Sequence, residues 1–346
     1  MRLEPETEEP AAGALGASVA PSPVHVRVAD VWAARASWAL WAVLLGAWCA
    51  GPLGLAWAWP FTLPANLLLW LVPAVLPVAL AWAWVGRTAL ALALVAHAPV
   101  WAVVCSPGGG STPPVAAAAA GPEWSALSFN VGDFRTRPED VVRAVLDSKA
   151  DLIALQELSL EQARAIASAC AADFPYQALF PHGPEGRGLL SRTPLSDVRF
   201  EQGESHRRQL FARVAVGGGF IEVAAVHLSV LAAIRGAAES SAAHLIAWAA
   251  TPGGHPRLLL GDFNSTPTSG VSTALKNAGL IDAFDACGPG AGFTFPVAGR
   301  YNGLPLPPFL RLDQAWCSAD CQVLEARVAA DGGGDHLPLA VRLRLP

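Results

Sequence analysis

The sequence lacks charge over a long internal stretch. No Asp, Glu, Lys or Arg occurs from residue 36 to residue 86, although 15% of the 346 residues are charged. A soluble domain keeps charged side chains on its surface, so this absence excludes an ordinary water-soluble fold for that stretch. Charged residues return at normal density after Gly121, which separates an apolar first part from a soluble domain of about 225 residues.

A surplus of basic residues is also missing. From Gly121 to the C-terminus, 19 Lys and Arg stand against 23 Asp and Glu, so this part is mildly acidic. A protein that binds nucleic acid mainly through its phosphates normally carries a positive balance. The composition therefore does not favour nucleic acid as a partner, although local basic patches remain open.

The uncharged stretch is too long for a single membrane crossing. About 50 residues would form a helix of about 75 Å, more than twice the roughly 30 Å of the hydrocarbon core. Prolines and tryptophans between Trp59 and Pro64 favour a reversal there, and a further apolar stretch runs to Cys105. We therefore predict three transmembrane helices within residues 36–105. They span about residues 38–58, 65–85 and 88–105.

Basic residues that flank these helices predict their orientation. Arg27 and Arg35 precede the first helix, and Arg87 lies between the second and the third. With the N-terminus inside, all three lie on the cytoplasmic side, as basic flanks usually do. The protein is then a multi-pass protein of the cell membrane, and residues 123–346 form a domain on the extracytoplasmic side.

Two further segments have no hydrophobic periodicity. Residues 1–35 begin with an acidic stretch rich in Pro, Ala and Gly, which predicts a disordered tail. Residues 106–122 are rich in Gly, Pro and Ala, which predicts a flexible linker between membrane and domain.

The domain contains four of the six cysteines. An even number permits disulfides in an oxidising compartment, and Cys317 and Cys321 are the pair nearest in sequence. Unpaired buried thiols are an equally good interpretation of the sequence. The four are Cys170, Cys287, Cys317 and Cys321.

Short β-like runs alternate with helical ones throughout the domain. This mixture favours an α/β fold in which outer helices cover the sheets. Helices are expected at Pro138–Lys149, which opens with an acidic turn, and at Ile234–Ala250. The expected strands are Ser125–Phe129, Leu152–Leu155, Leu189–Ser191, Leu210–Val216, Ile221–Val226, Arg257–Leu260 and Ala315–Cys317.

Polar side chains stand at the ends of these apolar strands. Strand ends border the functional crevice of α/β sheets, so such side chains can converge. Carboxylates and amides without clustered cysteines suit a hard, oxygen-preferring cation such as Mg2+ or Mn2+, and a histidine suits a phosphoryl oxygen. The residues are Asn130, Glu157, His227, Asp262, Asn264, Asp313, Asp335 and His336.

These residues belong to short motifs that occur in a particular order. The motifs are LSFN at 127–130, DLIALQE at 151–157, GLLSRTPL at 188–195, VHL at 226–228, GDFN at 261–264, LD at 312–313 and DHLP at 335–338. In their residues and in their order along the chain, these motifs resemble those of the endonuclease/exonuclease/phosphatase superfamily, which includes DNase-I-like nucleases, neutral sphingomyelinases and inositol polyphosphate phosphatases. The resemblance covers about residues 124–345, and it implies a four-layer α/β sandwich of two β-sheets flanked by helices.

The resemblance also implies a metal site. Asn130 and Glu157 would hold the divalent cation, with Glu157 as the essential ligand, and Asp335 would lie in the metal shell. Mg2+ is the expected ion, and Mn2+ is an alternative.

The catalytic roles that the resemblance implies concern five residues. Asp262 would position or deprotonate the attacking water, and Asn264 would hydrogen-bond the phosphoryl group. His336 would touch the scissile phosphate, oriented or charged by Asp313, while His227 would add a second phosphate contact. These groups suit in-line displacement at phosphorus.

Three functions remain open at the level of the sequence. The first is a membrane-anchored, Mg2+-dependent phosphoesterase that acts on a phospholipid or another small phosphodiester. The second is an extracytoplasmic nuclease, which the acidic domain and the absence of an obvious active-site aromatic residue do not favour. The third is a catalytically silent binding module of the same fold.

The expected partners are the lipid bilayer and the phosphoester substrate, and no protein partner can be inferred. Arg207 and Arg208 are either a solvated pair or substrate contacts.

Overall fold

The computed structural model describes the chain almost continuously from Gly121 to the C-terminus. The described residues are 35, 39, 42, 80, 84, 121–202, 207–234, 238–251, 253–303 and 305–346. Apart from isolated positions, and from Gly121 and Pro122 at the end of the predicted linker, the predicted tail, the three predicted transmembrane helices and the linker lie outside them. Within the described residues, no helix is both long enough and apolar enough to cross a membrane.

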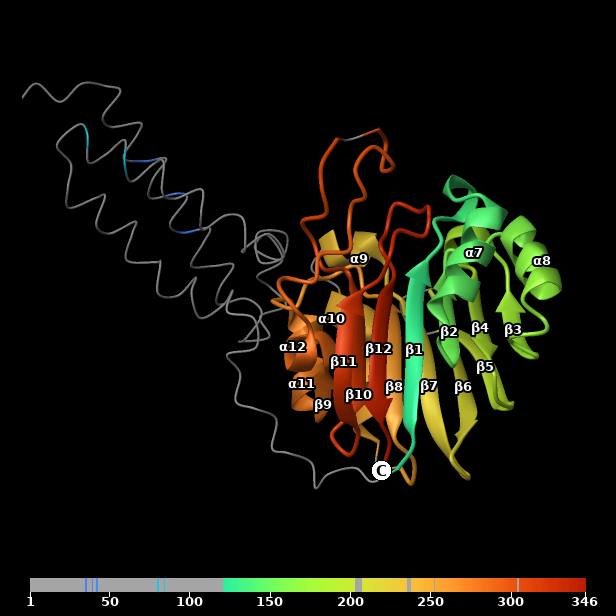
Figure 1. Ribbon diagram of the computed structural model, residues 1–346. Coiled ribbons are helices and arrows are strands. Elements are labelled where there is room, and N and C mark those ends of the chain that lie inside the picture. The colour runs from blue at the N-terminus through green and yellow to red at the C-terminus, as the bar shows by residue number, and fades with distance from the viewer. Residues whose placement is uncertain are drawn as a thin grey trace, which may run out of the picture. The chain divides into compact units, whose positions relative to one another are not determined.

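Two six-stranded sheets form the centre of the domain (Figure 1). The order in the first sheet is β11 (Gln322–Val328), β12 (Leu339–Arg344), β1 (Glu123–Asn130), β2 (Leu152–Gln156), β4 (Arg187–Ser191) and β3 (Tyr176–Phe180). The order in the second is β5 (Leu195–Gln202), β6 (Arg208–Val216), β7 (Gly219–His227), β8 (Arg257–Asp262), β10 (Asp313–Ser318) and β9 (Leu280–Asp282). Both sheets are mixed, because β1 pairs in parallel with β2, and β7 with β8, while the other pairs are antiparallel.

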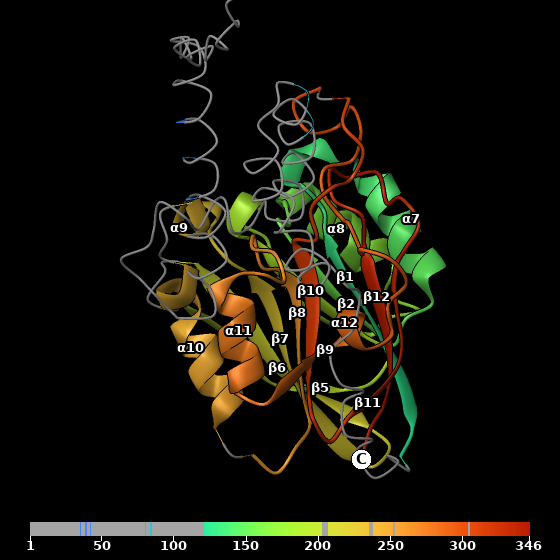
Figure 2. The same cartoon turned by 90° about the vertical axis from the view of Figure 1, so that its left-hand side faces the viewer.

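Helices cover the outer faces of the two sheets (Figure 1, Figure 2). On the first sheet lie α7 (Pro138–Ser148) and α8 (Leu160–Ala169), and on the second lie α10 (Ala238–Ala250) and α11 (Gly270–Asn277). The shorter helices are α9 (Val230–Ile234), α12 (Ala283–Cys287), η2 (Asp133–Arg135) and η3 (Gly183–Glu185). This arrangement confirms the predicted sandwich of two sheets between layers of helices.

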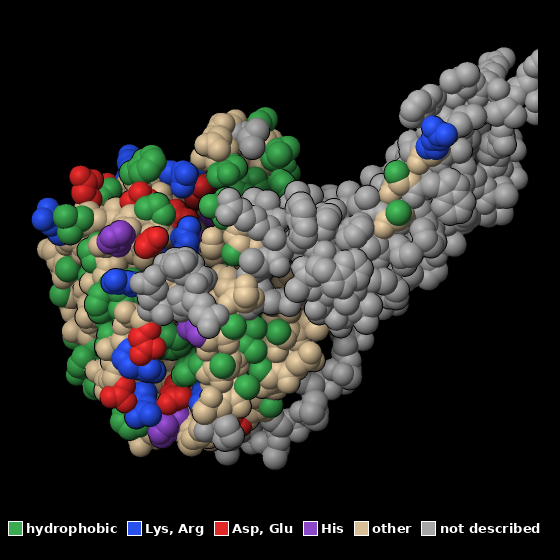
Figure 3. All heavy atoms as spheres, turned by 180° about the vertical axis from the view of Figure 1, so that it is seen from behind, with side chains coloured by type: hydrophobic (Ala, Val, Ile, Leu, Met, Phe, Trp, Pro, Cys, Tyr) green, Lys and Arg blue, Asp and Glu red, His purple; other side chains and the backbone are tan. Residues whose placement is uncertain are grey.

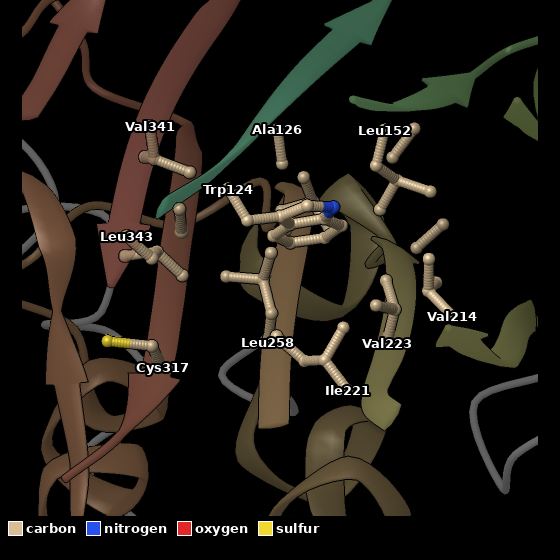
Figure 4. Packing of buried hydrophobic residues seen from close by; sticks show 14 of the residues in the cluster. Trp124, Ala126, Leu152, Val214, Ile221, Val223, Leu258, Cys317, Val341 and Leu343 are labelled. Carbon is tan, nitrogen blue, oxygen red and sulfur yellow. The ribbon is translucent and has the colours of Figure 1, made fainter. Parts of the chain in front are cut away.

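The alternation of side chains along each strand explains the three apolar cores of this sandwich. Trp124 and Ala126 of β1 point into the core between the two sheets, whereas Leu127 and Phe129 point toward α7 and α8. Figure 4 shows Trp124 in the inter-sheet core, close to Leu258 of the second sheet. Both faces of β1 are buried from Ala126 to Asn130, and its polar residues in this part, Ser128 and Asn130, are buried as well.

Local sequence signals account for the helix ends. The side chain of Ser159 accepts the backbone N–H of Gln162, and the side chain of Gln162 accepts the N–H of Ser159, so a capping box starts α8. Helix α7 begins at Pro138, as the sequence predicts. The expected helix over 234–250 is wrong at its start, because α9 ends at Ile234 and α10 begins at Ala238.

The four cysteines of the domain are free thiols. Cys170, Cys317 and Cys321 are buried, and Cys287 is exposed. The structure therefore follows the interpretation of unpaired thiols, which the sequence left open beside a disulfide. Burial raises the pKa of the Cys170 thiol to about 11, so this group is a packing residue rather than a nucleophile.

Candidate active site

The candidate site lies where the inter-sheet core ends in polar side chains. Side chains alternate between the two faces along β1, β7 and β8, so that Ala126, Ala225 and Leu260 point into this core. The last residue of each strand points to the same face and is polar. These last residues are Asn130, His227 and Asp262. The two sheets therefore deliver polar groups to one end of the space between them, because side chains two residues apart share a face.

Strand register brings three of the predicted residues of the second sheet together. His227 of β7 is the partner of Asp262 of β8, and Asp313 of β10 is the partner of the same Asp262 from the other side. His227, Asp262 and Asp313 are buried. They occupy neighbouring positions across the sheet, which the strand spacing of about 4.8 Å keeps close.

Asn130 connects the first sheet to the second. Its Nδ2 donates to Asp262 Oδ2 at 3.0 Å and lies 3.4 Å from Glu157 Oε1, while its Oδ1 accepts from the N–H of Gly132 at 3.0 Å. Asn130 is thus a hydrogen-bond donor to the two carboxylates in this arrangement. It can turn an oxygen toward a cation only after its amide group rotates.

Two of the predicted residues have left-handed backbones. Glu157 has φ of 53° and Asn264 has φ of 46°, a region that residues other than glycine seldom occupy. Each residue directly follows or closely follows a strand end, and the turn directs its side chain into the site. Such strain typically occurs at functional positions, where the surrounding structure enforces it.

The GDFN motif forms an Asx turn whose free oxygen points into the site. The N–H of Asn264 donates to Asp262 Oδ1 at 2.8 Å, which leaves Asp262 Oδ2 for the other polar groups. The side-chain nitrogen of Asn264 donates to the carbonyl of Leu228 at 2.9 Å and lies 3.3 Å from Asp262 Oδ2. Gly261 is required because a Cβ at this position would lie 1.9 Å from the carbonyl oxygen of Val226.

His336 and Asp313 form a buried ion pair. His336 Nδ1 donates to Asp313 Oδ2 at 2.8 Å, and its Nε2 lies 3.8 Å from Asp262 Oδ2. Burial of the ring opposes its charge, but Asp313 and Asp262 outweigh burial and raise the pKa of His336 to about 10. His336 is therefore an imidazolium near neutral pH. The ring of Phe295 packs against it at 4.7 Å between centroids.

His227 is held in the opposite charge state. Burial lowers the pKa of His227 well below its usual value, and the nearby Arg187 and Arg207 lower it further. Arg207 Nη1 lies 3.2 Å from Nδ1 and 3.5 Å from Nε2 of the ring, and a guanidinium can only donate. The nearer contact favours the tautomer with its proton on Nε2, which lies 3.6 Å from Asp262 Oδ2 and 3.7 Å from Glu157 Oε1.

Hydrogen bonds also fix the backbone of His227. Its N–H donates to Gln209 Oε1 at 2.8 Å, and its carbonyl accepts from Gln209 Nε2 and from Arg187 Nη2, each at 3.2 Å. Arg187 comes from β4 of the first sheet, so this bond also joins the two sheets behind the site. The position of His227 is therefore determined by both sheets.

Asp262 is a carboxyl group whose pKa the site displaces upward. Burial raises the pKa of Asp262 to about 7, the charge of His336 opposes the shift, and Asp313 adds to it. A carboxyl group with this pKa exchanges a proton readily near neutral pH. A bound cation would lower the value by stabilising the carboxylate.

Glu157 and Asp335 face a common cation, the side chain of Arg135. Arg135 Nη1 lies 3.6 Å from Glu157 Oε2 and 3.8 Å from Asp335 Oδ2. In the described part of the chain, no three His, Cys, Asp or Glu side chains converge closely enough to hold a metal by themselves. Two carboxylates around one positive charge fit Mg2+, which usually keeps several waters and binds through one or two carboxylates together with substrate phosphates.

A separate cavity lies away from these groups. It has a volume of about 610 Å³ and lies between α7 and the neighbouring strands of the first sheet. Charged side chains that line it already form ion pairs, since Asp140 pairs with Arg137 at 2.8 Å and with Arg143 at 3.0 Å. None of the eight predicted site residues lines it, so we assign it no part in the chemistry.

The structure thus brings all eight predicted site residues together. It also adds four residues that the sequence did not single out, because they reach the site only through the fold: Arg135, Arg187, Gln209 and Phe295. The sequence left open whether Arg207 and Arg208 are a solvated pair or substrate contacts. In the structure the two side chains have different surroundings. Arg207 contacts His227, while Arg208 packs over the ring of Phe200.

Known proteins resemble this chain in sequence and in fold. The sequence from residue 127 to residue 336 matches the Endonuclease/Exonuclease/phosphatase family. The uncharacterized protein YbhP of Escherichia coli K12 is 28% identical over 234 residues, which cover 60% of this chain and 87% of YbhP.

Two solved structures illustrate the likeness in fold. An endonuclease/exonuclease/phosphatase from Bacteroides vulgatus aligns with a TM-score of 0.55 and 17% identity, over 65% of this chain and 100% of that one. TDP2 of D. rerio, complexed with a single-strand DNA product, aligns with a TM-score of 0.51 and 15% identity, over 64% of this chain and 98% of that one. Because the family match covers most of the domain and more than half of the chain, the chain belongs to the Endonuclease/Exonuclease/phosphatase family of hydrolytic phosphoesterases, which generally depend on divalent metal ions.

Proposed function

We propose that this protein hydrolyses a phosphodiester, with a divalent cation and a water molecule that Asp262 activates. One observation carries the proposal. Asp262 Oδ2 lies within 4 Å of three groups from other strands and loops, namely Asn130 Nδ2 at 3.0 Å, His227 Nε2 at 3.6 Å and His336 Nε2 at 3.8 Å. A basic carboxylate surrounded by donors is suited to deprotonate water beside a phosphate whose charge those donors neutralise.

Each side chain then has a defined task. Asp262 Oδ2 receives the proton of the attacking water, whose oxygen bonds to phosphorus while the P–O bond to the leaving alcohol breaks, and the leaving oxygen takes a proton from solvent. His336, charged through its contact with Asp313 at 2.8 Å, donates from Nε2 to a phosphoryl oxygen. His227 is neutral and donates from Nε2 to a second oxygen. These two donors stabilise the negative charge that grows on the phosphoryl group in the transition state.

Asn264 has a more restricted role than the resemblance implies. Its side-chain nitrogen already donates to the carbonyl of Leu228 at 2.9 Å. It can therefore hydrogen-bond a phosphoryl oxygen only with its remaining N–H, which now points toward Asp262. In this arrangement Asn264 chiefly holds the Asp262 carboxylate in place.

The cation would be held by Glu157 and Asp335, with Asn130 as a further ligand once its amide rotates. Arg135 now neutralises these two carboxylates and would move aside. When bound, the cation would supply charge that polarises the phosphoryl oxygen. Mg2+ suits these oxygen ligands, and Mn2+ is the alternative.

A phospholipid or another small phosphodiester is the proposed substrate, and nucleic acid is the second candidate. The uncharged sequence from residue 36 to residue 86 and the acidic balance of the domain support the first. TDP2 of D. rerio was solved with a single-strand DNA product, which supports the second. We place the domain outside the cytoplasm, beside the cell membrane, on the basis of the basic flanks at Arg27, Arg35 and Arg87.

The test uses the purified full chain with Mg2+, with and without a chelator, on phosphodiesters, phosphomonoesters and DNA. We expect hydrolysis of a phosphodiester that the chelator abolishes. Glu157→Gln should lower the activity or the metal affinity by about 10-fold to 100-fold, because a neutral amide binds Mg2+ more weakly than a carboxylate. The matched control is Glu161→Gln, which changes an exposed glutamate of α8.

Two outcomes contradict the proposal. Equal turnover of Glu157→Gln and the parent chain at limiting Mg2+ would remove the metal assignment. Absence of hydrolysis on every substrate, with a folded chain, would favour the silent binding module.

A further inference from the structure

The exposed large apolar side chains of the domain are concentrated at the end that carries the candidate site. From Gly121 onward, the described residues include eight of them, and five lie within a few residues of site groups or in the loop that leads to Asp313. The three most exposed are among these five: Phe134 at 82%, Leu231 at 57% and Leu160 at 53%. The other two of the five are Val230 and Leu306.

Backbone contacts tie these side chains to the site. Phe134 follows Asp133, whose N–H donates to the carbonyl of Glu157 at 2.8 Å. Leu231 lies in the helix that begins three residues after His227. The loop that carries Leu306 is anchored by the N–H of Phe309, which donates to the carbonyl of Phe295 at 2.9 Å.

The remaining three exposed apolar side chains lie elsewhere. Tyr176 and Phe220 are at the strand ends opposite the site, because Tyr176 pairs with Ser191 and Phe220 is at the start of β7. Val198 lies at an irregularity of β5. Figure 3 shows hydrophobic side chains among charged ones along the upper end of the domain, which corresponds to the upper end of Figure 1.

We propose that Phe134, Val230, Leu231 and Leu306 form an apolar rim that enters a lipid surface, so that the site takes its phosphoester from a lipid headgroup. This inference rests on the proposed phosphodiesterase function and names its substrate class. Exposed apolar side chains that surround a polar site are costly in water and are typical of a surface that meets a membrane or a partner.

The chemistry of the rim favours lipid as its occupant. The guanidinium of Arg135 lies 5.7 Å from the ring centre of Phe134, and it also faces Glu157. An aromatic ring in the acyl region with a cation at the level of the phosphates is the usual arrangement at a bilayer interface. A lipid whose apolar chains lie in the bilayer then presents its phosphate at the level of Arg135, beside the metal ligands.

The length of the linker before the domain is compatible with contact between the rim and the lipid bilayer. The uncharged sequence ends at residue 86, and the linker predicted at 106–122 has 17 residues. Gly121 and Pro122 already pair with Leu345 at the end of the C-terminal strand, so residues 106–120 bridge the distance, and 15 fully extended residues reach about 50 Å. The chain enters the domain at the end opposite the site, where the N–H of Gly121 donates to the carbonyl of Leu345. Strand β1 spans only about 26 Å, so the linker is long enough for the site to turn toward the bilayer that holds the predicted helices.

The first test measures contact between the rim and lipid by fluorescence, in a chain that does not need to be catalytically active. An environment-sensitive fluorescent amino acid replaces Leu231 in the full chain that also carries Glu157→Gln. We expect a blue shift in nanodiscs of phosphatidylcholine and phosphatidylglycerol, compared with the same chain in amphipol, which provides no lipid surface. The matched control carries the same amino acid at Phe220, where no shift is expected.

The second test compares two substrates. The double variant Phe134→Ser/Leu231→Ser should lose at least about 10-fold in hydrolysis of phospholipid in nanodiscs, because insertion scales with the buried apolar area. Its hydrolysis of soluble bis-p-nitrophenyl phosphate should change by less than 2-fold. The control Tyr176→Ser/Phe220→Ser removes two exposed rings at the other end and should change neither rate.

The outcomes separate this inference from the proposed function. Hydrolysis of the soluble diester without a fluorescence shift at position 231 would overturn the rim and leave the phosphodiesterase intact. A lipid-dependent shift without hydrolysis of any substrate would support the lipid-binding rim and contradict the phosphodiesterase. A shift that depends on protein concentration instead of lipid would assign the surface to a second copy of the chain.

Discussion

Asp262 and His336 act on opposite sides of the same proposed reaction. In the proposed reaction Asp262 would receive a proton from water and His336 would neutralise charge on the phosphate, so both groups would stabilise one transition state. Asp262→Asn and His336→Ala should each lower turnover by at least about 100-fold, which is within the usual range for loss of a general acid or base. The double variant should lose much less than the product of the two single losses, because the groups work as a unit.

Turnover and thermal midpoint should be measured on the same preparations of these variants. If GDFN were only a structural turn, Asp262→Asn would be less stable yet would turn over at a normal rate per folded molecule. A stable and fully active Asp262→Asn chain would contradict the mechanism.

The charge of His336 also has a consequence for stability. Its pKa is raised to about 10 by Asp313 and Asp262 against the effect of burial, compared with about 6.5 for an unfolded histidine. A raised pKa stabilises the folded state fully below pH 6.5, and this contribution is lost as the pH rises toward 10. In metal-free protein, the difference in free energy of unfolding between the parent and His336→Gln should therefore decrease as the pH rises from about 6.5 toward 10. Urea unfolding at several pH values measures it, and a difference that grows with pH would contradict the ion pair.

The residues of the site differ in how well the sequence could predict them. Asp262 and His227 end apolar strands in recognisable motifs, so their convergence follows from strand ends and family order. Arg187 and Gln209 cannot be found in this way, because each stabilises His227 across 40 and 18 residues of sequence. The Arg187 contact arises only when the two sheets pack together, and the Gln209 contact arises only when β6 pairs with β7.

At the scale of elements, the close approach of β7 and β8 is a specific requirement of the fold. A Cβ at Gly261 would lie 1.9 Å from the carbonyl of Val226, and backbone cannot move aside as a flexible side chain can. Gly261→Ala should lower the free energy of unfolding by at least about 3 kcal/mol, in the range of severe overpacking. Gly254→Ala is the control, since nothing lies within 4 Å of its Cβ position. Thermal or urea unfolding compares the two, and equal stability of both variants would contradict the strand spacing.

Elements with strong apolar runs could be predicted, and elements without them could not. Strands β2 and β8 are buried on both faces, and each contains a short unbroken apolar run, Leu152–Leu155 in β2 and Leu258–Leu260 in β8. Strand β11 is largely half-buried at the edge of its sheet, so its sequence has no clear pattern. The helix expected over 234–250 begins at Ala238 in the structure, and the short helix α9 (Val230–Ile234) was not expected.

At the scale of the whole molecule, the domain and the apolar first part give separate predictions. The domain has its own three cores and its own site, and a family match from residue 127 to residue 336. The first part contributes only a sequence pattern: no charge from residue 36 to residue 86, and basic residues at three flanks. The side of the membrane on which the site works therefore depends on the number of crossings.

Three crossings predict opposite sides for the two ends of the chain. Arg27, Arg35 and Arg87 all lie on the cytoplasmic side if the N-terminus is inside and three helices span the bilayer. A reporter that is active only in the cytoplasm, fused after Pro346, should therefore be inactive, and a reporter that is active only outside should be active. Moving the same reporters to a position directly after Arg87 should reverse both results, which controls for expression. Activity of the cytoplasmic reporter at Pro346 would mean an even number of crossings, and it would place the phosphoesterase site beside the inner leaflet instead of the outer one.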